Sequence, residues 1–446
     1  MGEITWRSLL IVTVRSRLRG LARSVPARHG HPAASLDCAP CSTLQWPDRM
    51  SGAAAPTVLL DPPGEPGAPA ADAGAPSIVH AGERRSRRIE SLRAVAALGV
   101  LVGHAFLTAM AYRSTSSGWA RQIVSGGLLA VFLFFTLSGY LLFWPWVRRH
   151  FDGGPSISLG RYARNRALRV LPLYFVTLAV LLWLAPLGAH RSDWWRFALL
   201  LENFSPRTAE RLDSAMWSLV VEIQFYLVLP FLAAAIMRIG RGSIGRALAL
   251  VGLLAGGSFA LRLHWLLLHG PVSLDPLRGP LSLPTLFFFF CGGMAVALLR
   301  VAWTRRPPAW LHGRLGSPDA WLLASVPAWV IAAHDNRLEP LILLAAFLVV
   351  GGCVLAPGGG VLVQALEWRP LAAIGLASYS LYLWHVPLLT ALSHARIVYT
   401  PNPVDLAAPQ SFPALLALGL PVCLVVAGLS YVLVESPFLR LRRRWA

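Results

Sequence analysis

Among the ionisable residues of the first strongly hydrophobic segment, residues 87–110, two lie within its apolar part. Arg93 stands near its start and His104 in its middle, eleven residues apart. A helix turns about 100° per residue, so both side chains face the same side, about 16 Å apart along the axis. The segment is long enough to cross a bilayer, where such side chains are costly. Their presence predicts chemistry: a guanidinium suits phosphate groups, and an imidazole suits general base catalysis.

Membrane helices are the elements that must position these residues. Of the 446 residues, 55% are hydrophobic and only 14% are charged, which excludes an ordinary soluble domain. The formal net charge is +19, and all 40 basic residues are Arg. A basic excess can indicate nucleic-acid binding, but here the Arg runs lie between apolar segments, as in cytoplasmic loops. The composition predicts an all-α polytopic membrane protein, with the lipid bilayer as its partner and no nucleic acid.

Ten apolar segments are predicted to span the membrane, at about 89–111, 122–146, 170–188, 214–237, 246–268, 282–300, 320–334, 338–356, 371–394 and 412–434. The seventh is the least secure, because a span usually needs about 20 residues. Alternate loops carry the Arg excess, including the segments before the first span and after the last. This distribution predicts that both termini are cytoplasmic.

The predicted orientation gives a depth for each polar residue in the spans. His104 and His385 each lie about 21 Å from the inner surface. Glu222 lies about 13 Å below the outer surface of a roughly 30 Å hydrocarbon core. Four arginines gather instead at the inner boundary: Arg93, Arg164, Arg166 and Arg169. We therefore expect a polar site near the midplane that opens toward a basic cytoplasmic mouth, suited to a phosphate-bearing donor.

Each of these residues also has a purely structural explanation. His104 could hydrogen-bond a neighbouring helix, and Glu222 could link two helices. His385 precedes a proline by two positions and could mark a kinked helix. The arginines could serve only membrane topology. Ser138 with the following glycine is typical of close helix packing.

Seven sequence blocks, in order over about residues 88–440, resemble the membrane-bound acyltransferase-3 family of bacterial O-acyltransferases. They are IESLRAVAALGVLVGHAF with Arg93 and His104, VFLFFTLSGYLL with Ser138, RNRALRVLPLY with Arg166 and Arg169, WSLVVEIQFYLVLP with Trp217 and Glu222, LFFFFCGGMAVALL, IGLASYSLYLWHVP with Tyr379, Tyr382 and His385, and VESPF with Glu435. Any one block is a weak signal, whereas seven in order on the predicted spans are strong.

The resemblance implies a multi-pass enzyme of the bacterial plasma membrane, with residues 81–446 as its acyltransferase domain. It would transfer an acyl group, by default acetyl, from cytoplasmic acyl-CoA to a hydroxyl of a carbohydrate, glycolipid or glycosylated metabolite, without a metal. Arg93, Arg166 and Arg169 would engage the CoA phosphates or shape the donor site. Some family members append a periplasmic SGNH-type esterase domain. This chain ends shortly after the tenth span, so a stand-alone enzyme is expected.

His104 is by this resemblance the catalytic base or a transient acyl carrier. We expect it to take the proton of the acceptor hydroxyl, which attacks the thioester carbonyl. Glu222, or a Tyr or Ser hydroxyl, is expected to position His104 or to polarise the reacting group. Five further residues are expected to bind substrate or support the site: Ser138, Trp217, Tyr379, Tyr382 and His385.

Two other classes of function compete with the enzyme. A proton-coupled transporter could use the midplane His and Glu as a relay, although no clear internal repeat is visible. A non-catalytic membrane scaffold or sensor would need no buried ionisable cluster. The sequence therefore favours an enzyme. It does not determine the length of the acyl group, the acceptor or the oligomeric state.

The N-terminal 80 residues fall outside the resemblance. Residues 26–80 are rich in Pro, Ala and Gly and lack periodicity, so we predict that residues 1–80 form a disordered tail outside the core. Cys38 and Cys41 have C-x-x-C spacing, but no second ligand pair accompanies them. Met50 begins a shorter reading frame, and we hypothesise that residues 1–49 are absent from the natural product.

Overall fold

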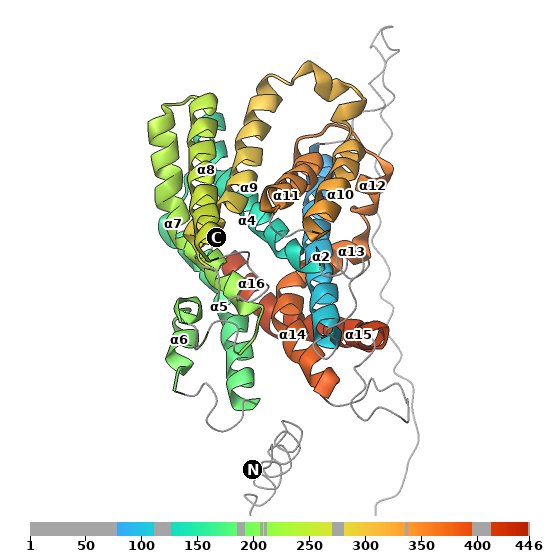
Figure 1. Ribbon diagram of the computed structural model, residues 1–446. Coiled ribbons are helices and arrows are strands. Elements are labelled where there is room, and N and C mark those ends of the chain that lie inside the picture. The colour runs from blue at the N-terminus through green and yellow to red at the C-terminus, as the bar shows by residue number, and fades with distance from the viewer. Residues whose placement is uncertain are drawn as a thin grey trace, which may run out of the picture. The chain divides into compact units, whose positions relative to one another are not determined.

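The computed structural model describes residues 78–110, 126–184, 192–205, 208, 212–269, 281–334, 338–394 and 412–444. Within these ranges helices are the only regular secondary structure (Figure 1). The predicted tail lies outside the described residues up to residue 77, and so do both cysteines of the C-x-x-C pair and Met50.

The chain forms long helices joined by short helical or irregular segments. In order they are α2 (Ile78–Met110), α4 (Ala130–Asp152), α5 (Leu159–Leu184), α6 (Trp194–Ala198), α7 (Met216–Gly240), α8 (Ile244–His269), α9 (Leu283–Arg305), α10 (Pro318–His334), α11 (Glu339–Val354), α12 (Val361–Ala365), α13 (Arg369–Leu376), α14 (Ser378–His394), α15 (Phe412–Ser430) and α16 (Ser436–Arg444). The prediction of an all-α polytopic membrane protein is confirmed.

Seven of the described helices are long and apolar enough to cross a membrane. The bent pair α13 and α14, which meet at 71°, would make an eighth span if the two helices cross together. A helix stands at each of the ten predicted spans, but α10 and α11 have only 17 and 16 residues. The count of ten and the cytoplasmic position of both termini stay predictions.

Helix α5 extends well beyond its predicted span, because it begins at Leu159 rather than near residue 170. Arg, Ala and Leu are strong helix formers, so the segment RYARNRALR continues the apolar helix. Arg166 and Arg169 are consequently helical residues three positions apart, on neighbouring parts of one face. The predicted basic mouth is therefore built partly on a rigid helix and not on a loop.

Helices α4 and α9 approach each other closely through two glycines. A Cβ atom on Gly139 would lie 2.1 Å from the carbonyl oxygen of Phe290, and one on Gly293 would lie 1.9 Å from that of Thr136. Only glycine permits this contact between backbones. Close helix packing, which the sequence suggested for the Ser138–Gly139 pair, therefore explains Gly139, whereas Ser138 lines a cavity.

Helix α2 packs against α13, α14 and α15, which lie beside it in Figure 1. At the bend before α14, a Cβ on Gly375 would lie 1.8 Å from the carbonyl oxygen of Glu90, so α13 presses directly on α2. After α15, residues Tyr431–Glu435 form a π-helical turn that packs against α5. Such turns often occur at functional sites, because the extra residue redirects side chains.

Candidate active site

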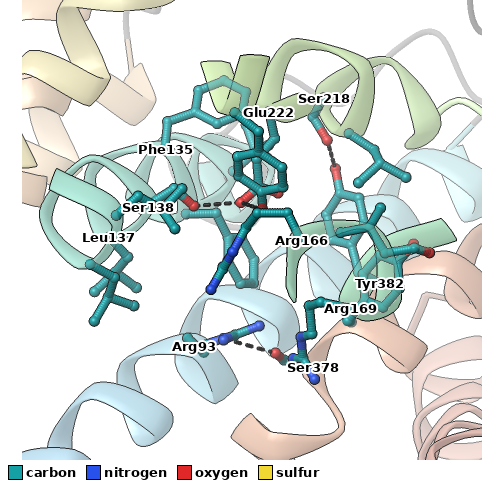
Figure 2. A pocket seen from close by; sticks show the side chains of 18 residues that line it. Arg93, Phe135, Leu137, Ser138, Arg166, Arg169, Ser218, Glu222, Ser378 and Tyr382 are labelled. Carbon is teal, nitrogen blue, oxygen red and sulfur yellow. Dashed lines mark hydrogen bonds between the residues drawn. The ribbon is translucent and has the colours of Figure 1, made fainter. Parts of the chain in front are cut away.

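A cavity of about 100 Å³ lies among α2, α4, α5, α7 and α14 (Figure 2). Its charged lining consists of Arg93, Arg166 and Arg169 opposite one carboxylate, that of Glu222. Phe134, Phe135 and several aliphatic side chains supply the apolar wall. The arginines expected at one boundary and the acid expected deeper therefore share one cavity.

Glu222 is held within the cavity by two hydroxyl groups. Its Oε1 accepts a hydrogen bond of 2.5 Å from Ser138 Oγ on α4 and one of 2.6 Å from the Tyr226 hydroxyl, one turn further along α7. Figure 2 shows the bond to Ser138 across the cavity. Both hydroxyls donate to the same carboxylate oxygen and fix its position. Ser138 and Glu222, predicted from separate spans, thus meet.

The three arginines differ in how fully they are paired. Arg169 makes an ion pair of 2.8 Å from Nη1 to Glu435 Oε2. Arg93 Nε donates to Ser378 Oγ at 3.3 Å and lies 4.0 Å from Glu90 Oε2. Arg169 is therefore committed to a protein carboxylate, whereas the partners of Arg93 are distant or uncharged.

Arg166 has no carboxylate within ion-pair distance among the described residues. Its guanidinium lies 5.9 Å from the ring centroid of Tyr226, a cation–π contact, and its buried Nε lacks a hydrogen-bond partner. A buried donor without a partner is costly unless a ligand supplies an acceptor. Arg166 is thus the cavity arginine most available to an anion.

Glu435 completes the site, although the predicted depths of the polar residues did not indicate it. Its Oε1 accepts hydrogen bonds from Ser380 N at 3.0 Å and Ser380 Oγ at 2.5 Å, and its side chain is only 1% exposed. The carboxylate thereby joins α14 to α5 through Arg169. The sequence signal was its place in the VESPF block, but the distance of 266 residues from Arg169 gave no indication of the pairing.

The aromatic residues predicted to support the site hold neighbouring elements in place. The Tyr379 hydroxyl donates to Val170 O on α5 at 2.8 Å. Trp217 lies edge-on to Phe135, with ring centroids 6.2 Å apart, and its carbonyl oxygen accepts from Asn203 Nδ2. Tyr379 lines the cavity, whereas Trp217 packs behind it. Their positions suit support more than contact with a reacting group.

His104 and His385 contact each other outside the cavity lining. His385 Nε2 lies 3.1 Å from His104 Nδ1, and the rings meet edge to face at 4.9 Å. His385 is 1% exposed. The predicted depths therefore bring two of the three midplane residues together. Glu222 is instead bound to Ser138 and Tyr226, and no hydrogen bond joins it to either imidazole in the described part of the chain.

Tyr382 connects the cavity with the histidine pair. Its ring lines the cavity and lies 5.5 Å from the His385 ring. Its hydroxyl shares a hydrogen bond of 2.6 Å with Ser218 Oγ and donates to Ala215 O at 3.2 Å. Figure 2 marks the bond to Ser218 with a dashed line. The Tyr382 side chain therefore contacts both the cavity and the His385 ring.

The segment before α7 holds two buried carboxyl groups outside the membrane-spanning helices. Burial raises the pKa of Glu202 to about 7, and burial raises the pKa of Asp213 to about 7. Asp213 Oδ1 accepts from Ala215 N at 2.9 Å. The carbonyl oxygen of Ala215 also accepts a hydrogen bond from the Tyr382 hydroxyl. This segment therefore contacts a residue that lines the cavity.

Comparison with known proteins adds an independent finding. Residues 86–430 match the model of a family described as an acyltransferase domain, Acyl_transf_3. The chain is similar to the putative peptidoglycan O-acetyltransferase YrhL of Bacillus subtilis, with 25% identity over 78% of this chain and 54% of the relative. It is also similar to the peptidoglycan O-acetyltransferase OatA of Listeria monocytogenes, with 22% identity over 78% and 55%, respectively.

The O-acetyltransferase OatA of Staphylococcus aureus is 23% identical over 68% of this chain and 50% of its own length. The chain therefore spans about half the length of the curated relatives it matches. No solved structure gives a significant match.

Proposed function

Because the chain belongs to the acyltransferase-3 family, whose domain covers residues 86–430, we propose that it is a membrane O-acyltransferase that uses acyl-CoA. The acyl group is acetyl by default, and the acceptor is a hydroxyl of a carbohydrate, glycolipid or glycosylated metabolite. The observation that carries the proposal is a cationic cavity whose lining residue Tyr382 lies against a pair of imidazoles, 5.5 Å from the His385 ring.

The charge of the cavity favours an anionic donor. Three arginines face it with one carboxylate, and Glu435 compensates only Arg169. Guanidinium groups bind phosphate oxygens through paired hydrogen bonds and keep their charge. We therefore assign Arg166 and Arg93 to the phosphates or the polar arm of CoA. The cavity is too small for the whole cofactor and would hold one part of it.

His104 would act as the base in the transfer step. It takes the proton from the acceptor hydroxyl while the oxygen attacks the thioester carbonyl carbon. The carbon–sulfur bond then breaks, and the thiolate receives the proton from the imidazolium, which restores neutral His104. Alternatively, His104 carries the acyl group transiently, in which case an acid-quenched sample of the intact protein gains the mass of that group.

The relatives point to one class of acceptor. Two of them are named peptidoglycan O-acetyltransferases, which supports a cell-wall glycan among the candidate carbohydrates. Their bacterial sources and the apolar helices support a place in the plasma membrane. A cytoplasmic donor would then meet an acceptor from the other side near the midplane.

Mass spectrometry of glycans and metabolites tests the proposal. Cells that carry the active gene are compared with cells that carry the His104→Ala variant at equal expression. We expect an acyl mass on one product that is lost in the variant, together with consumption of acyl-CoA by membranes. Substrate flux across membranes without acyl-CoA consumption would contradict the proposal and favour a transporter.

A further inference from the structure

The hydrogen bonds of the histidine pair determine where its protons lie. His385 Nδ1 lies 2.7 Å from the carbonyl oxygen of Tyr382, and His104 Nδ1 lies 3.0 Å from that of Val100. A carbonyl oxygen can only accept, so each Nδ1 must carry a proton. In a neutral imidazole the other nitrogen is then bare. Both rings therefore have an unprotonated Nε2.

The contact between the rings agrees with this assignment. The bare His385 Nε2 lies 3.1 Å from His104 Nδ1, so it accepts the proton that His104 also directs at Val100 O. If His385 Nε2 donated the hydrogen bond instead, the buried His385 ring would carry a second proton. His104 Nδ1 would then be an acceptor and would face a second acceptor, Val100 O, without a proton between them. The remaining nitrogen, His104 Nε2, has no hydrogen-bond partner among the described residues and keeps its lone pair.

We propose that His385 is a positioning residue that fixes His104 in the tautomer whose Nε2 is the base. The proposal rests on the proposed function for the role of His104 and adds the group that orients it. His385 occupies the place that a carboxylate holds in hydrolase triads, where the partner of Nδ1 fixes the tautomer and supports the imidazolium. No carboxylate bonds to either imidazole in the part of the chain that the structure describes.

The partner has a defined part in the reaction step. The acceptor oxygen forms a bond to the acyl carbon, its proton moves to His104 Nε2, and the sulfur takes the electrons of the broken carbon–sulfur bond. During this step His104 carries protons on both nitrogens. Its Nδ1–H stays bonded to His385 Nε2, which spreads the charge without any permanent charge in the apolar surroundings. The proton on Nε2 then passes to the thiolate sulfur.

Helix α14 explains why His385 can perform this role. Tyr382 lies one turn before His385 on the same helix and supplies the carbonyl oxygen that holds the far side of the ring. The same tyrosine lines the cavity with its ring. A single helical turn thus fixes the imidazole on one side and faces the proposed donor site on the other.

Two substitutions at one position separate the positioning role from simple packing. In His385→Gln the amide oxygen can replace Nε2 as the acceptor for His104. In His385→Asn the shorter amide can keep the bond to Tyr382 O but does not reach His104.

We expect kcat to fall about 100-fold in the Asn variant and to stay within about tenfold of wild type in the Gln variant. KM for acyl-CoA stays unchanged in both, since His385 does not line the cavity. Equal losses in the two variants, or none in His385→Asn, would overturn the proposal.

Nitrogen NMR of the wild-type protein, labelled with ¹⁵N-histidine in nanodiscs, tests the tautomer without any activity assay and without relying on the folding of a position-385 variant. The His104 signals are assigned by their loss in His104→Ala. We expect a protonated Nδ1 and a bare Nε2 on His104, and a protonated Nε2 would overturn the positioning role. If the tautomer is as expected but His104→Ala keeps full acyl transfer, the proposed base is wrong while the geometry of the pair stands.

Discussion

Arg166 and Arg169 stand three residues apart on α5 and line one cavity, but their charges have different partners. Glu435 compensates Arg169, whereas Arg166 has no ion pair among the described residues and lies over the Tyr226 ring. A bound anion gains most where the protein has not already satisfied the donor. At the scale of single residues, the two arginines should therefore respond differently to substitution.

We expect Arg166→Ala to weaken acyl-CoA binding about tenfold to 100-fold, because a charge-assisted hydrogen bond contributes about 1.5–3 kcal/mol. Titration calorimetry of the purified protein in nanodiscs measures the Kd. Arg306→Ala, which removes an exposed arginine away from the cavity, is the matched control and should leave the Kd unchanged. Equal Kd values for wild type and Arg166→Ala would contradict the assignment.

The ion pair of Arg169 and Glu435 joins whole elements: α5, α14 and the π-helical turn after α15. Glu435 is 1% exposed and Arg169 is 15% exposed, so neither charge is well hydrated. Loss of one partner from a buried pair leaves an uncompensated charge, which costs about 3–5 kcal/mol.

Glu435→Gln should therefore lower the thermal midpoint markedly, and Arg169→Met added to it should restore part of the loss. A double-mutant cycle on unfolding in detergent gives the coupling energy. Additive effects of the two substitutions would show that the pair does not connect the helices. Glu367→Gln, at the more exposed pair with Arg88, serves as the control and should cost less.

The segment before α7 should respond to pH, because the folded pKa of Glu202 and that of Asp213 are each about 7. Unfolded carboxyl groups have a pKa of about 4. The folded state thus favours the neutral acids, and their contribution to stability is complete below about pH 4 and is lost as the pH rises through about 7.

Hydrogen exchange across residues 192–215 is the measurement. We expect faster exchange at pH 8 than at pH 6, after correction for the intrinsic rate, and a weaker dependence in the double variant Glu202→Gln, Asp213→Asn. Unchanged protection between the two pH values in the wild type would argue against buried neutral acids in this segment.

At the scale of the whole molecule, hydrophobicity predicted where the long apolar helices lie, although not where α5 begins. A bilayer requires about 20 apolar residues per span, so each apolar segment was visible without its neighbours. The depth of each polar residue in the membrane was also partly predictable, because the rise per residue is constant in a helix. That regularity brought His104 and His385 to one level, and the structure has them in contact.

Contacts between distant segments could not be predicted in this way. Depth fixes height in the membrane but not the direction in which a side chain points, so Glu222 shared the level of the histidines in prediction and bonds to Ser138 instead. The partner of Arg169 and the buried pair of Arg262 with Glu339 depend on helix packing far apart in sequence. The bend before α14 and the π-helical turn were likewise not predicted.

The central claim is that the cationic cavity binds the donor while His104 performs the transfer. Its most direct test is single-turnover acyl transfer from labelled acetyl-CoA to a glycan acceptor by purified protein in nanodiscs, with the donor Kd measured on the same samples. We predict that His104→Ala slows transfer by about 10²–10⁴-fold and leaves the donor Kd unchanged. Transfer at the wild-type rate by His104→Ala, with intact donor binding, would contradict the claim.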